Sequence, residues 1–225
     1  MKKFILTVLS FIALGAYNHT MAQSHASSGP EKNPNLKDAG TYKGEKKQGK
    51  MHGQGIYEWK NGDKFEGNFE NGQINGYGRY SWTDGDIYQG SFKNGKQNGV
   101  GSAFYADKCN VYEGEWKDGK RNSHGKLTWA NGDTYEGEWK DDVRVGEGVF
   151  TAANGDKYVS HYENNQRNGF GTYYHNNGDV YAGQWVNGEK EGLGTYTTPS
   201  GRTIAGNWKD NRFAGNVNDA VLAAR

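Results

Sequence analysis

Aromatic residues recur along this chain at a fixed interval, and each opens a run in which apolar and polar positions alternate. Successive runs start 23 residues apart, except for one interval of 24. The starting residues are Tyr42, Phe65, Tyr88, Tyr112, Tyr135, Tyr158 and Tyr181, and an incomplete eighth copy starts at Ile204. Such a period is typical of small supersecondary units that bury surface only against their neighbours. The sequence therefore predicts one elongated array over residues 41–216.

The fourth copy shows how one repeat is expected to fold. Side chains alternate between the two faces of a strand. Tyr112 and Trp116 therefore share one face, with Gly114 between them, whereas Glu113 and Glu115 share the other. This alternation predicts a short strand with an aromatic face turned inward and a charged face turned to solvent.

Turn dipeptides separate the strands. Asp118-Gly119 and Asn131-Gly132 are dipeptides that tight hairpin turns prefer, because Gly and Asn accept the positive φ that these turns need. Each repeat is thus predicted to hold two strands and two turns. The seven complete copies would give fourteen strands, at about 4.8 Å per strand.

Glycines alternate with aromatic residues on the second strand of each repeat. Gly53, Gly55, Tyr57 and Trp59 fall on one face of that strand. A glycine on the aromatic face leaves room for a ring to lie flat against the backbone. We expect the glycines to make space for the rings that form the core.

The combined pattern, Tyr-x-Gly-x-Trp followed by Gly-x-Gly and an Asn-Gly-Asp turn, resembles the membrane occupation and recognition nexus (MORN) repeat family. The resemblance covers about residues 41–216, as seven full repeats and a partial eighth. It implies an all-β fold, an elongated single-layer antiparallel sheet of consecutive β-hairpins. Members of that family serve as scaffolds, dimerisation modules and, in some cases, phospholipid binders.

Several positions depart from the repeat. Ser123 and Ser160 replace repeat glycines, Asp142 and Asn165 replace turn glycines, and the third copy has an extra residue near Cys109. Asn and Asp tolerate left-handed backbone better than other non-glycine residues, so both turns are expected to persist. A bulge or bend is expected at the junction of the third and fourth copies and in the sixth copy.

Composition limits the kind of core and the kind of partner. Only 33% of residues are apolar, but 14% are aromatic and 35 are glycine, so burial must come from a thin layer of rings. The chain has 27 basic and 26 acidic residues and a formal net charge of +1. This balance argues against a nucleic-acid partner.

The first 22 residues follow the plan of a secretory signal peptide. Lys2 and Lys3 precede an apolar run over residues 4–16, and Thr20 and Ala22 supply small residues before a cleavage site. We expect a protein exported in the bacterial manner, periplasmic or extracellular after cleavage near Ala22; a retained anchor is the alternative. Residues 23–40 are expected to be a disordered leader, and 217–225 a short C-terminal tail or cap.

Candidate chemistry is sparse, because almost every polar residue has a counterpart in the next repeat. No His-Glu-x-x-His motif, phosphate-binding loop or nucleophile elbow is present. A metal site near His124, His161 and His175, and a calcium ladder at the turn aspartates, are alternatives with too few converging ligands. Cys109 is either an unpaired thiol or a link between two chains. We expect no enzyme activity, no cofactor and no metal.

An aromatic row in the N-terminal half is the candidate surface for a partner or ligand. It consists of Tyr57, Trp59, Tyr80, Trp82, Tyr105 and Trp129. The same rings are also the expected core, so burial is the alternative. The sequence favours an exported, non-catalytic scaffold that binds another protein or itself, as in a homodimer. The second hypothesis is an envelope module that binds carbohydrate or phospholipid through this row.

Overall fold

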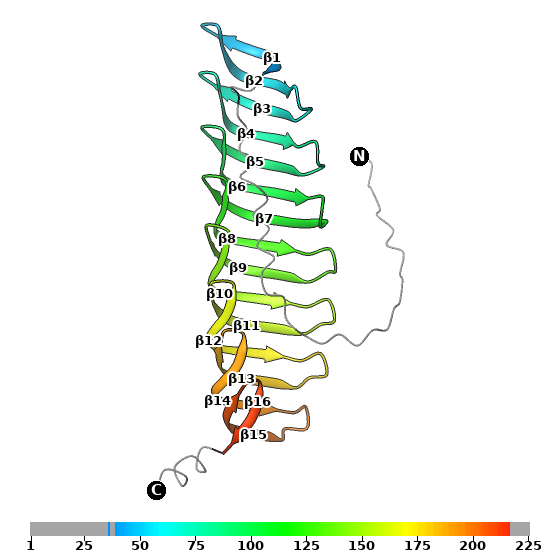
Figure 1. Ribbon diagram of the computed structural model, residues 1–225, viewed down its shortest axis with the longest axis vertical. Helices are drawn as coiled ribbons and strands as arrows, with labels where there is room; N and C mark the ends of the chain where they lie inside the picture. The colour runs from blue at the N-terminus through cyan, green and yellow to red at the C-terminus, as the bar shows by residue number, and fades with distance from the viewer. Residues whose placement is uncertain (1–35, 37–38, 217–225) are drawn as a thin grey trace.

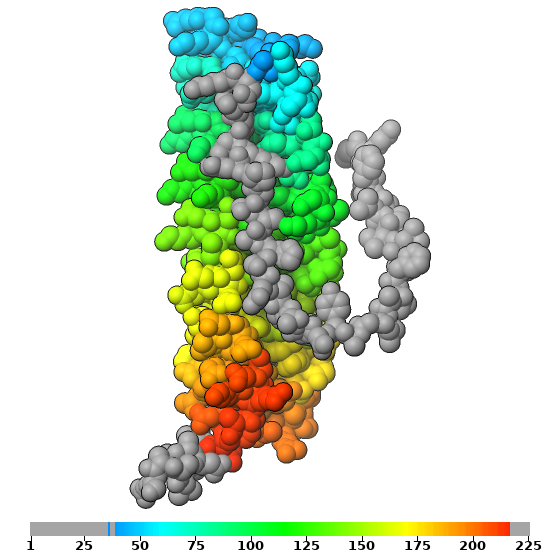
Figure 2. Space-filling view, viewed as in Figure 1, coloured from blue at the N-terminus to red at the C-terminus, as the bar shows by residue number. Residues whose placement is uncertain are grey.

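The structure is a computed structural model that describes residue 36 and residues 39–216. Its strands follow one another in chain order within a single antiparallel sheet, so each strand pairs only with its neighbours in the sequence (Figure 1). In the space-filling view the colours also follow one another along the long axis (Figure 2). The all-β prediction of consecutive hairpins in one elongated sheet is confirmed.

The sheet contains sixteen strands rather than fourteen, because the incomplete eighth copy also folds as a hairpin. The strands are β1 (Gly40–Lys47), β2 (Lys50–Trp59), β3 (Lys64–Glu70), β4 (Gln73–Ser81), β5 (Ile87–Lys93), β6 (Lys96–Tyr105), β7 (Asn110–Lys117), β8 (Lys120–Thr128), β9 (Thr134–Lys140), β10 (Val143–Thr151), β11 (Lys157–Glu163), β12 (Gln166–Tyr174), β13 (Val180–Val186), β14 (Glu189–Thr197), β15 (Thr203–Lys209) and β16 (Arg212–Gly215).

Two kinds of turn alternate along the array. Within a repeat the turn has two central residues with positive φ, as at Asn71 (52°) and Gly72 (86°). Asp142 and Asn165, which replace glycine in this turn, keep positive φ at 72° and 69°, as expected. Longer turns join one repeat to the next, and Trp59 N–H donates across such a turn to Asp63 O at 2.9 Å.

A β-bulge bends every repeat, not only the irregular ones. In β3–β4, Gly67 pairs with Gly78 and Phe69 pairs with Ile74, so β4 contributes extra residues between the two pairs. An equivalent shift of register occurs in all eight hairpins with tight turns. The bulge is therefore part of the repeat, and the expectation that it would mark two irregular places was wrong. The sixth copy has the same bulge as the others, and the β6–β7 junction near Cys109 has none, because Tyr105 and Asn110 there form one additional strand pair.

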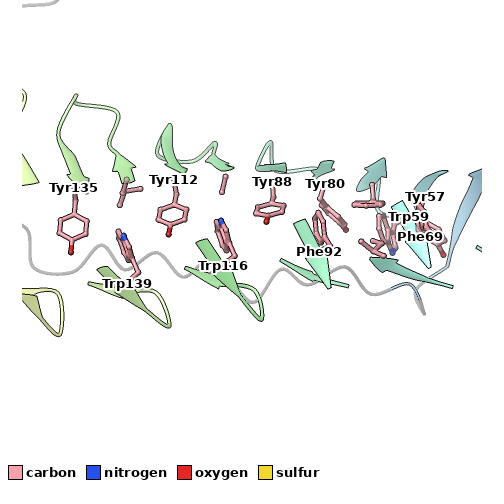
Figure 3. Close-up of a cluster of buried hydrophobic side chains, with 14 of the residues drawn as sticks. Tyr57, Trp59, Phe69, Tyr80, Tyr88, Phe92, Tyr112, Trp116, Tyr135 and Trp139 are labelled. Atoms are coloured by element: carbon pink, nitrogen blue, oxygen red, sulfur yellow. The ribbon is translucent and has the colours of Figure 1, made fainter. Parts of the chain in front are cut away.

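Glycine pairs form the niche in which each tyrosine lies, as predicted. A Cβ on Gly125 would overlap the phenol ring of Tyr112, and a Cβ on Gly114 would come within 2.6 Å of its Oη. The Tyr112 Oη donates to Glu115 O at 3.1 Å, which fixes the ring against the backbone. The bulged sheet wraps around these rings, and Figure 3 shows them in single file with strand segments on two opposite sides. We call this side of the sheet the inner face.

Edge-to-face ring contacts connect one repeat to the next. Tyr112 contacts Trp116 of its own repeat, with ring centroids 5.2 Å apart and planes at 89°. It also contacts Trp139 of the following repeat at 5.5 Å and 86°. Such contacts add about 0.5–1.5 kcal/mol to the burial of each ring pair. The core is therefore a file of rings that binds neighbouring repeats together.

The sixth repeat interrupts this file. Ser160 replaces the niche glycine, and its buried hydroxyl has no hydrogen-bond partner among the described residues. The ring of Tyr158 instead stacks on Tyr173, with centroids 3.9 Å apart and planes at 8°. The buried residues consequently form two clusters, one ending at Tyr162 and one beginning at Tyr158.

The predicted signal peptide, most of the leader and the C-terminal tail lie outside the described residues. Among residues 36 and 39–216, no helix has the length and apolar character needed to cross a membrane.

Candidate functional site

The six residues predicted to form a recognition surface all lie on the inner face of the first four repeats. Tyr57 and Trp59 end β2, Tyr80 and Trp82 lie at the end of β4, and Tyr105 and Trp129 take the equivalent places at β6 and β8. The structure brings four of them into one chain of rings. Centroids are 4.6 Å apart for Tyr57 and Trp59, 5.0 Å for Trp59 and Tyr80, and 4.3 Å for Tyr80 and Trp82.

Burial divides this row into core residues and rim residues. Tyr57 and Trp59 are each 7% exposed and Tyr80 is 3% exposed. The other three, Trp82, Tyr105 and Trp129, are only partly buried and pack against that core. A partner on this face would therefore meet the three rim rings first.

A row of buried and partly buried cations on the inner face was missed at the sequence level. Arg121, Arg144, Arg167 and Lys190 follow the tight turns at the repeat interval, in places that are Met51, Ile74 and Gln97 in the first three copies. Arg121 is 3% exposed, and its guanidinium lies 4.3 Å from the ring of Trp139. Arg167 lies 4.2 Å from the ring of Tyr158 and 4.3 Å from Trp185. The signal was the change from uncharged residues to arginine or lysine at one repeat position.

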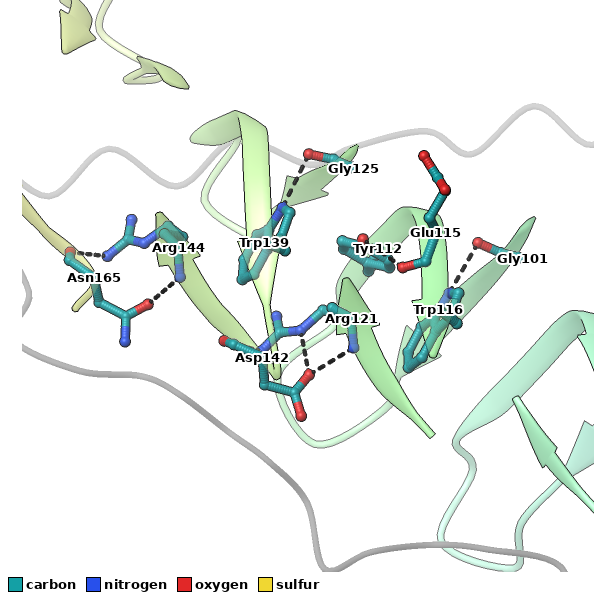
Figure 4. A network of polar contacts seen from close by, with 10 residues as sticks. All are labelled: Gly101, Tyr112, Glu115, Trp116, Arg121, Gly125, Trp139, Asp142, Arg144 and Asn165. Atoms are coloured by element: carbon teal, nitrogen blue, oxygen red, sulfur yellow. Dashed lines mark hydrogen bonds and ion pairs between the residues drawn. The ribbon is translucent and has the colours of Figure 1, made fainter. Parts of the chain in front are cut away.

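The cations differ in what balances their charge. Arg121 Nε donates to Asp142 Oδ1 at 2.9 Å, in an ion pair between consecutive tight turns (Figure 4). Arg144 Nη2 donates instead to the backbone oxygen of Asn165 at 2.8 Å, and Arg167 Nη2 to Gly188 O at 2.7 Å. Burial is the largest influence on Arg144 and lowers its pKa. For Arg144 and Arg167, aromatic ring faces and backbone carbonyl groups thus partly replace the carboxylate that balances the charge of Arg121.

Tryptophan N–H groups tie the rings to the glycine-rich strands. Trp116 Nε1 donates to Gly101 O at 3.2 Å, and Trp139 Nε1 donates to Gly125 O at 3.1 Å (Figure 4). The same bond recurs at Trp185. Each indole is therefore positioned by both packing and a hydrogen bond, which makes the inner face rigid below its rim.

The repeat geometry agrees with a family comparison. A family model for the MORN repeat matches residues 42–64, 65–87, 88–109, 112–134, 135–157, 158–180 and 181–201. The chain belongs to the MORN repeat family. The matched segments start at the same residues as the seven copies in the sequence, and the hairpin β15–β16 extends the MORN array beyond them.

Solved structures similar to the MORN array have low sequence identity to it. One is the TCP domain of SAS-4 (dCPAP) of Drosophila melanogaster in complex with a proline-rich motif of Ana2 (dSTIL). It is 12% identical, with a TM-score of 0.46, over 70% of this chain and 85% of that chain. Another is the TCP10 domain of Danio rerio CPAP in complex with a peptide of STIL, 12% identical with a TM-score of 0.28, over 75% of this chain and all of that chain. No curated protein sequence matches this chain.

Aspartates in the long turns join successive MORN repeats. Asp133 Oδ1 accepts a hydrogen bond from Ala153 N–H at 2.8 Å, and Asp156 Oδ1 accepts one from Asn176 N–H at 2.8 Å. Burial alone would raise the pKa of Asp156, but hydrogen bonds led by that from Tyr173 Oη, at 2.6 Å, hold it below its usual value. The aspartates thus act as links between turns, which explains their recurrence without calcium.

The histidines proposed as an alternative metal site lie apart. His161 Nδ1 is 3.1 Å from Glu147 Oε1 on the outer face, opposite to the rings. His175 lies on the inner face, 3.9 Å from the ring of Tyr173. Within the part of the chain that the structure describes, no three His, Cys, Asp or Glu side chains gather closely enough to hold a metal ion.

The outer face of the MORN sheet is charged in the middle and apolar near the C-terminus. Lys126 lies opposite Glu113 on one side and Glu136 on the other, as expected for cross-strand charge pairing. Farther along, Phe170 is 71% exposed and Leu193 is 49% exposed, and both line a shallow hollow over β11–β14. This apolar patch was not predicted, because its repeat position is polar or charged in three other copies, at Gln54, His124 and Glu147.

Proposed function

We propose that this protein is a non-catalytic exported scaffold whose inner aromatic face binds a protein partner or a second copy of the chain. The observation that carries the proposal is the row of rim rings Trp82, Tyr105 and Trp129, which repeats along a rigid core. Tryptophan and tyrosine dominate the energetics of protein interfaces because they supply large apolar area at low entropic cost. A long row of such rings suits an extended protein segment better than a compact small molecule.

Two further features support the individual parts of this proposal. The sequence of residues 1–22 supports export to the periplasm or the extracellular space. Among the described strands, β1 and β16 pair on one side only, so each end of the sheet offers backbone groups to another strand. Self-association would use these ends, the inner face, or the exposed thiol of Cys109.

Pull-down and chemical crosslinking with the exported chain test the proposal. Trp82→Ala and Trp129→Ala remove rim rings, while Phe170→Ala and Leu193→Ala are matched controls on the outer face. We expect partner capture or self-association to be lost in the first pair and kept in the second. If the unsubstituted chain captures no protein and stays monomeric, or if the outer-face variants alone lose binding, the proposal is wrong.

A carbohydrate or phospholipid module is the second candidate, and the half-buried indoles of Trp82 and Trp129 favour it because indole faces stack on sugar rings. The cations Arg121 and Arg167 are buried below the rings, which favours a sugar over a lipid head group. Glycan arrays and liposome sedimentation with the same variants separate this candidate from the first. Trp59→Ala is unsuitable here, since Trp59 belongs to the buried core.

A further inference from the structure

Three consecutive cations on the inner face have no carboxylate partner among the described residues. They are Arg144, Arg167 and Lys190, at one position of the fifth, sixth and seventh repeats. Arg121, at the same position of the fourth repeat, pairs with Asp142, but no ion pair between described residues involves the other three cations. Because surroundings of low polarity screen a charge weakly, these cations keep a strong attraction for an anion.

Arg167 also holds a buried donor without an acceptor. It is 9% exposed, and its Nη1 has no hydrogen-bond partner within the described part of the chain. Lys190 lies in the next repeat, with Nζ 4.6 Å from the ring of Tyr181 and 5.3 Å from that of Trp208. Burial lowers the pKa of Lys190, and the charge of Arg167 lowers it further. Two like charges held near each other without a counter-charge favour an anion at this place.

The repeats that hold these cations lack the large rim rings of the first four repeats. The position of Trp82 and Trp129 is taken by smaller side chains in the last three full copies: Ala152, His175 and Thr198. Arg144 and Lys190 are partly exposed. Asp179 at this rim accepts a hydrogen bond from Tyr196 Oη at 2.6 Å and forms no ion pair with Lys190. A side chain from outside can therefore reach both cations.

The fourth repeat shows that a carboxylate fits this position. Asp142 Oδ1 accepts hydrogen bonds from the backbone N–H of Arg121 at 3.1 Å and from its Nε at 2.9 Å. The backbone N–H of Arg144 donates instead to the amide oxygen of Asn165, at 2.9 Å, which leaves the guanidinium charge uncompensated. A carboxylate carries one charge and a phosphate group up to about two. The carboxylate is therefore less costly to desolvate beside a partly buried cation.

We propose that Arg144 and Lys190 bind carboxylates of an extended acidic segment of a protein partner, while Arg167 adds its charge from below. Arg144 lies near the start of β10 and Lys190 near the start of β14, four strands farther along, which is about 19 Å at 4.8 Å per strand. An extended segment advances about 3.3 Å per residue, so carboxylates about six residues apart match this spacing. The inference rests on the proposed function and deepens it, because it names the chemistry of the partner.

Two variants of one tight turn test the proposal. Asn165→Asp places a carboxylate where Asp142 stands in the preceding copy, so we expect it to neutralise Arg144 from within the chain. Asn164→Asp adds the same charge at the neighbouring exposed position, where the preceding copy already has Asp141. Both positions have positive φ, which Asp tolerates. The two variants therefore have equal net charge and differ in whether the new carboxylate faces Arg144.

The probe is a peptide of serine and glycine with a glutamate at every sixth position, and a matched peptide has glutamine there. Titration at low ionic strength is followed by the indole N–H signals of Trp185 and Trp208, which lie beside Arg167 and Lys190. We expect the glutamate peptide to shift both signals and to leave that of Trp59 in place. Asn165→Asp should raise its Kd about tenfold, and Asn164→Asp less than about twofold.

Several outcomes would overturn the proposal: equal binding of the two peptides, binding of neither, or equal Kd values for the two variants. Shifts that depend on the concentration of the chain alone would assign the site to a second copy. Binding of phosphatidylglycerol vesicles in place of the peptide would assign it to a lipid. Either result would also overturn the proposal.

The same variants separate this inference from the proposed function. If a protein captured through Trp82 and Trp129 binds the Asn165→Asp variant as tightly as the parent chain, the acidic segment is wrong and the proposed function stands. If no protein is captured, the proposed function fails, and the peptide titration still decides whether the cations bind carboxylates.

Discussion

Asp142 neutralises Arg121 across consecutive repeats, whereas the equivalent arginine of the next repeat, Arg144, meets only the amide residue Asn165. In the first pair Arg121 Nε donates to Asp142 Oδ1 at 2.9 Å. In the second, Asn165 Oδ1 accepts from Arg144 N–H at 2.9 Å, and the guanidinium turns to the backbone oxygen. The same scaffold therefore accepts a cation against its ring file both with an adjacent carboxylate, at Arg121, and without one, at the partly buried Arg144.

This comparison predicts how Asp142 responds to substitution. Asp142→Asn keeps an acceptor for Arg121 N–H and reproduces the neighbouring repeat, so we expect a loss of about 1 kcal/mol in the free energy of unfolding. Asp142→Gly keeps the positive φ but removes both contacts, and we expect a loss of about 3 kcal/mol. Urea denaturation measures both values. Equal losses in the two variants would show that the carboxylate charge alone matters.

The glycine niche predicts a large steric effect at Gly125. A Cβ there overlaps the buried ring of Tyr112, whose neighbours are backbone and cannot move aside. We expect Gly125→Ala to lower the free energy of unfolding by about 3 kcal/mol or more. Gly49→Ala is the control, since no atom lies within 4 Å of its Cβ and only its positive φ of 73° adds a cost, about 1–2 kcal/mol. The idea of a niche fails if both variants are equally stable.

Ser160→Gly should repair the interruption of the ring file. It removes a buried hydroxyl without a partner among the described residues, which costs about 1–3 kcal/mol, against about 0.5–1 kcal/mol for the added flexibility of glycine. We expect a gain of about 1 kcal/mol by urea denaturation, and a change in the near-ultraviolet circular dichroism as the Tyr158 ring leaves Tyr173. Ser160→Ala keeps the Cβ in the niche, so its spectrum should stay as in the parent protein. A spectral change in the alanine variant would contradict this explanation.

Buried phenols predict a loss of stability in alkali. Burial raises the pKa of Tyr181 to about 12 and raises the pKa of Tyr88, Tyr112 and Tyr135 further. In the unfolded chain tyrosine ionises near pH 10. Because the folded state holds these protons more tightly, the buried phenols stabilise the fold fully below pH 10. This contribution to the free energy of unfolding is lost as the pH rises toward the pKa values of the folded state. At pH 11 we expect a loss on the order of 1 kcal/mol for each fully buried phenol.

Urea denaturation between pH 9 and 11.5, followed together with tyrosinate absorbance, checks this prediction. In the folded protein the absorbance should rise only for exposed tyrosines such as Tyr77, which is 55% exposed. Full ionisation of all tyrosines before the sheet unfolds would contradict the buried-phenol account.

The period of the sequence predicted most of the fold because each hairpin contacts only its neighbours. Tyr112, Gly114 and Trp116 share a face by strand alternation alone, and the turn residues mark where each strand ends. The second strand of the eighth copy was not predicted, because Ile204 replaces the aromatic residue that opens every other copy. The bulge was missed as a regular feature because it changes the register without changing the repeat length.

The candidate site was only half visible in the sequence. Strand alternation places Tyr57, Trp59, Tyr80 and Trp82 on one face, but alternation does not say how far that face is enclosed. The bend at each bulge closes the sheet around Tyr57, Trp59 and Tyr80 and leaves Trp82 at the rim. The same closure brings the arginines after the tight turns onto ring faces, a contact between positions that are distant along each strand.

By itself, the sequence determined the repeat, the strands, the turn types and the inward face of the rings, since these depend on interactions within one hairpin and the next. Only the tertiary structure decided which rings are buried, which cation has a carboxylate, and where the ring file breaks at Ser160. Those outcomes depend on the curvature of the whole sheet, and curvature accumulates from many small bends that no single repeat specifies.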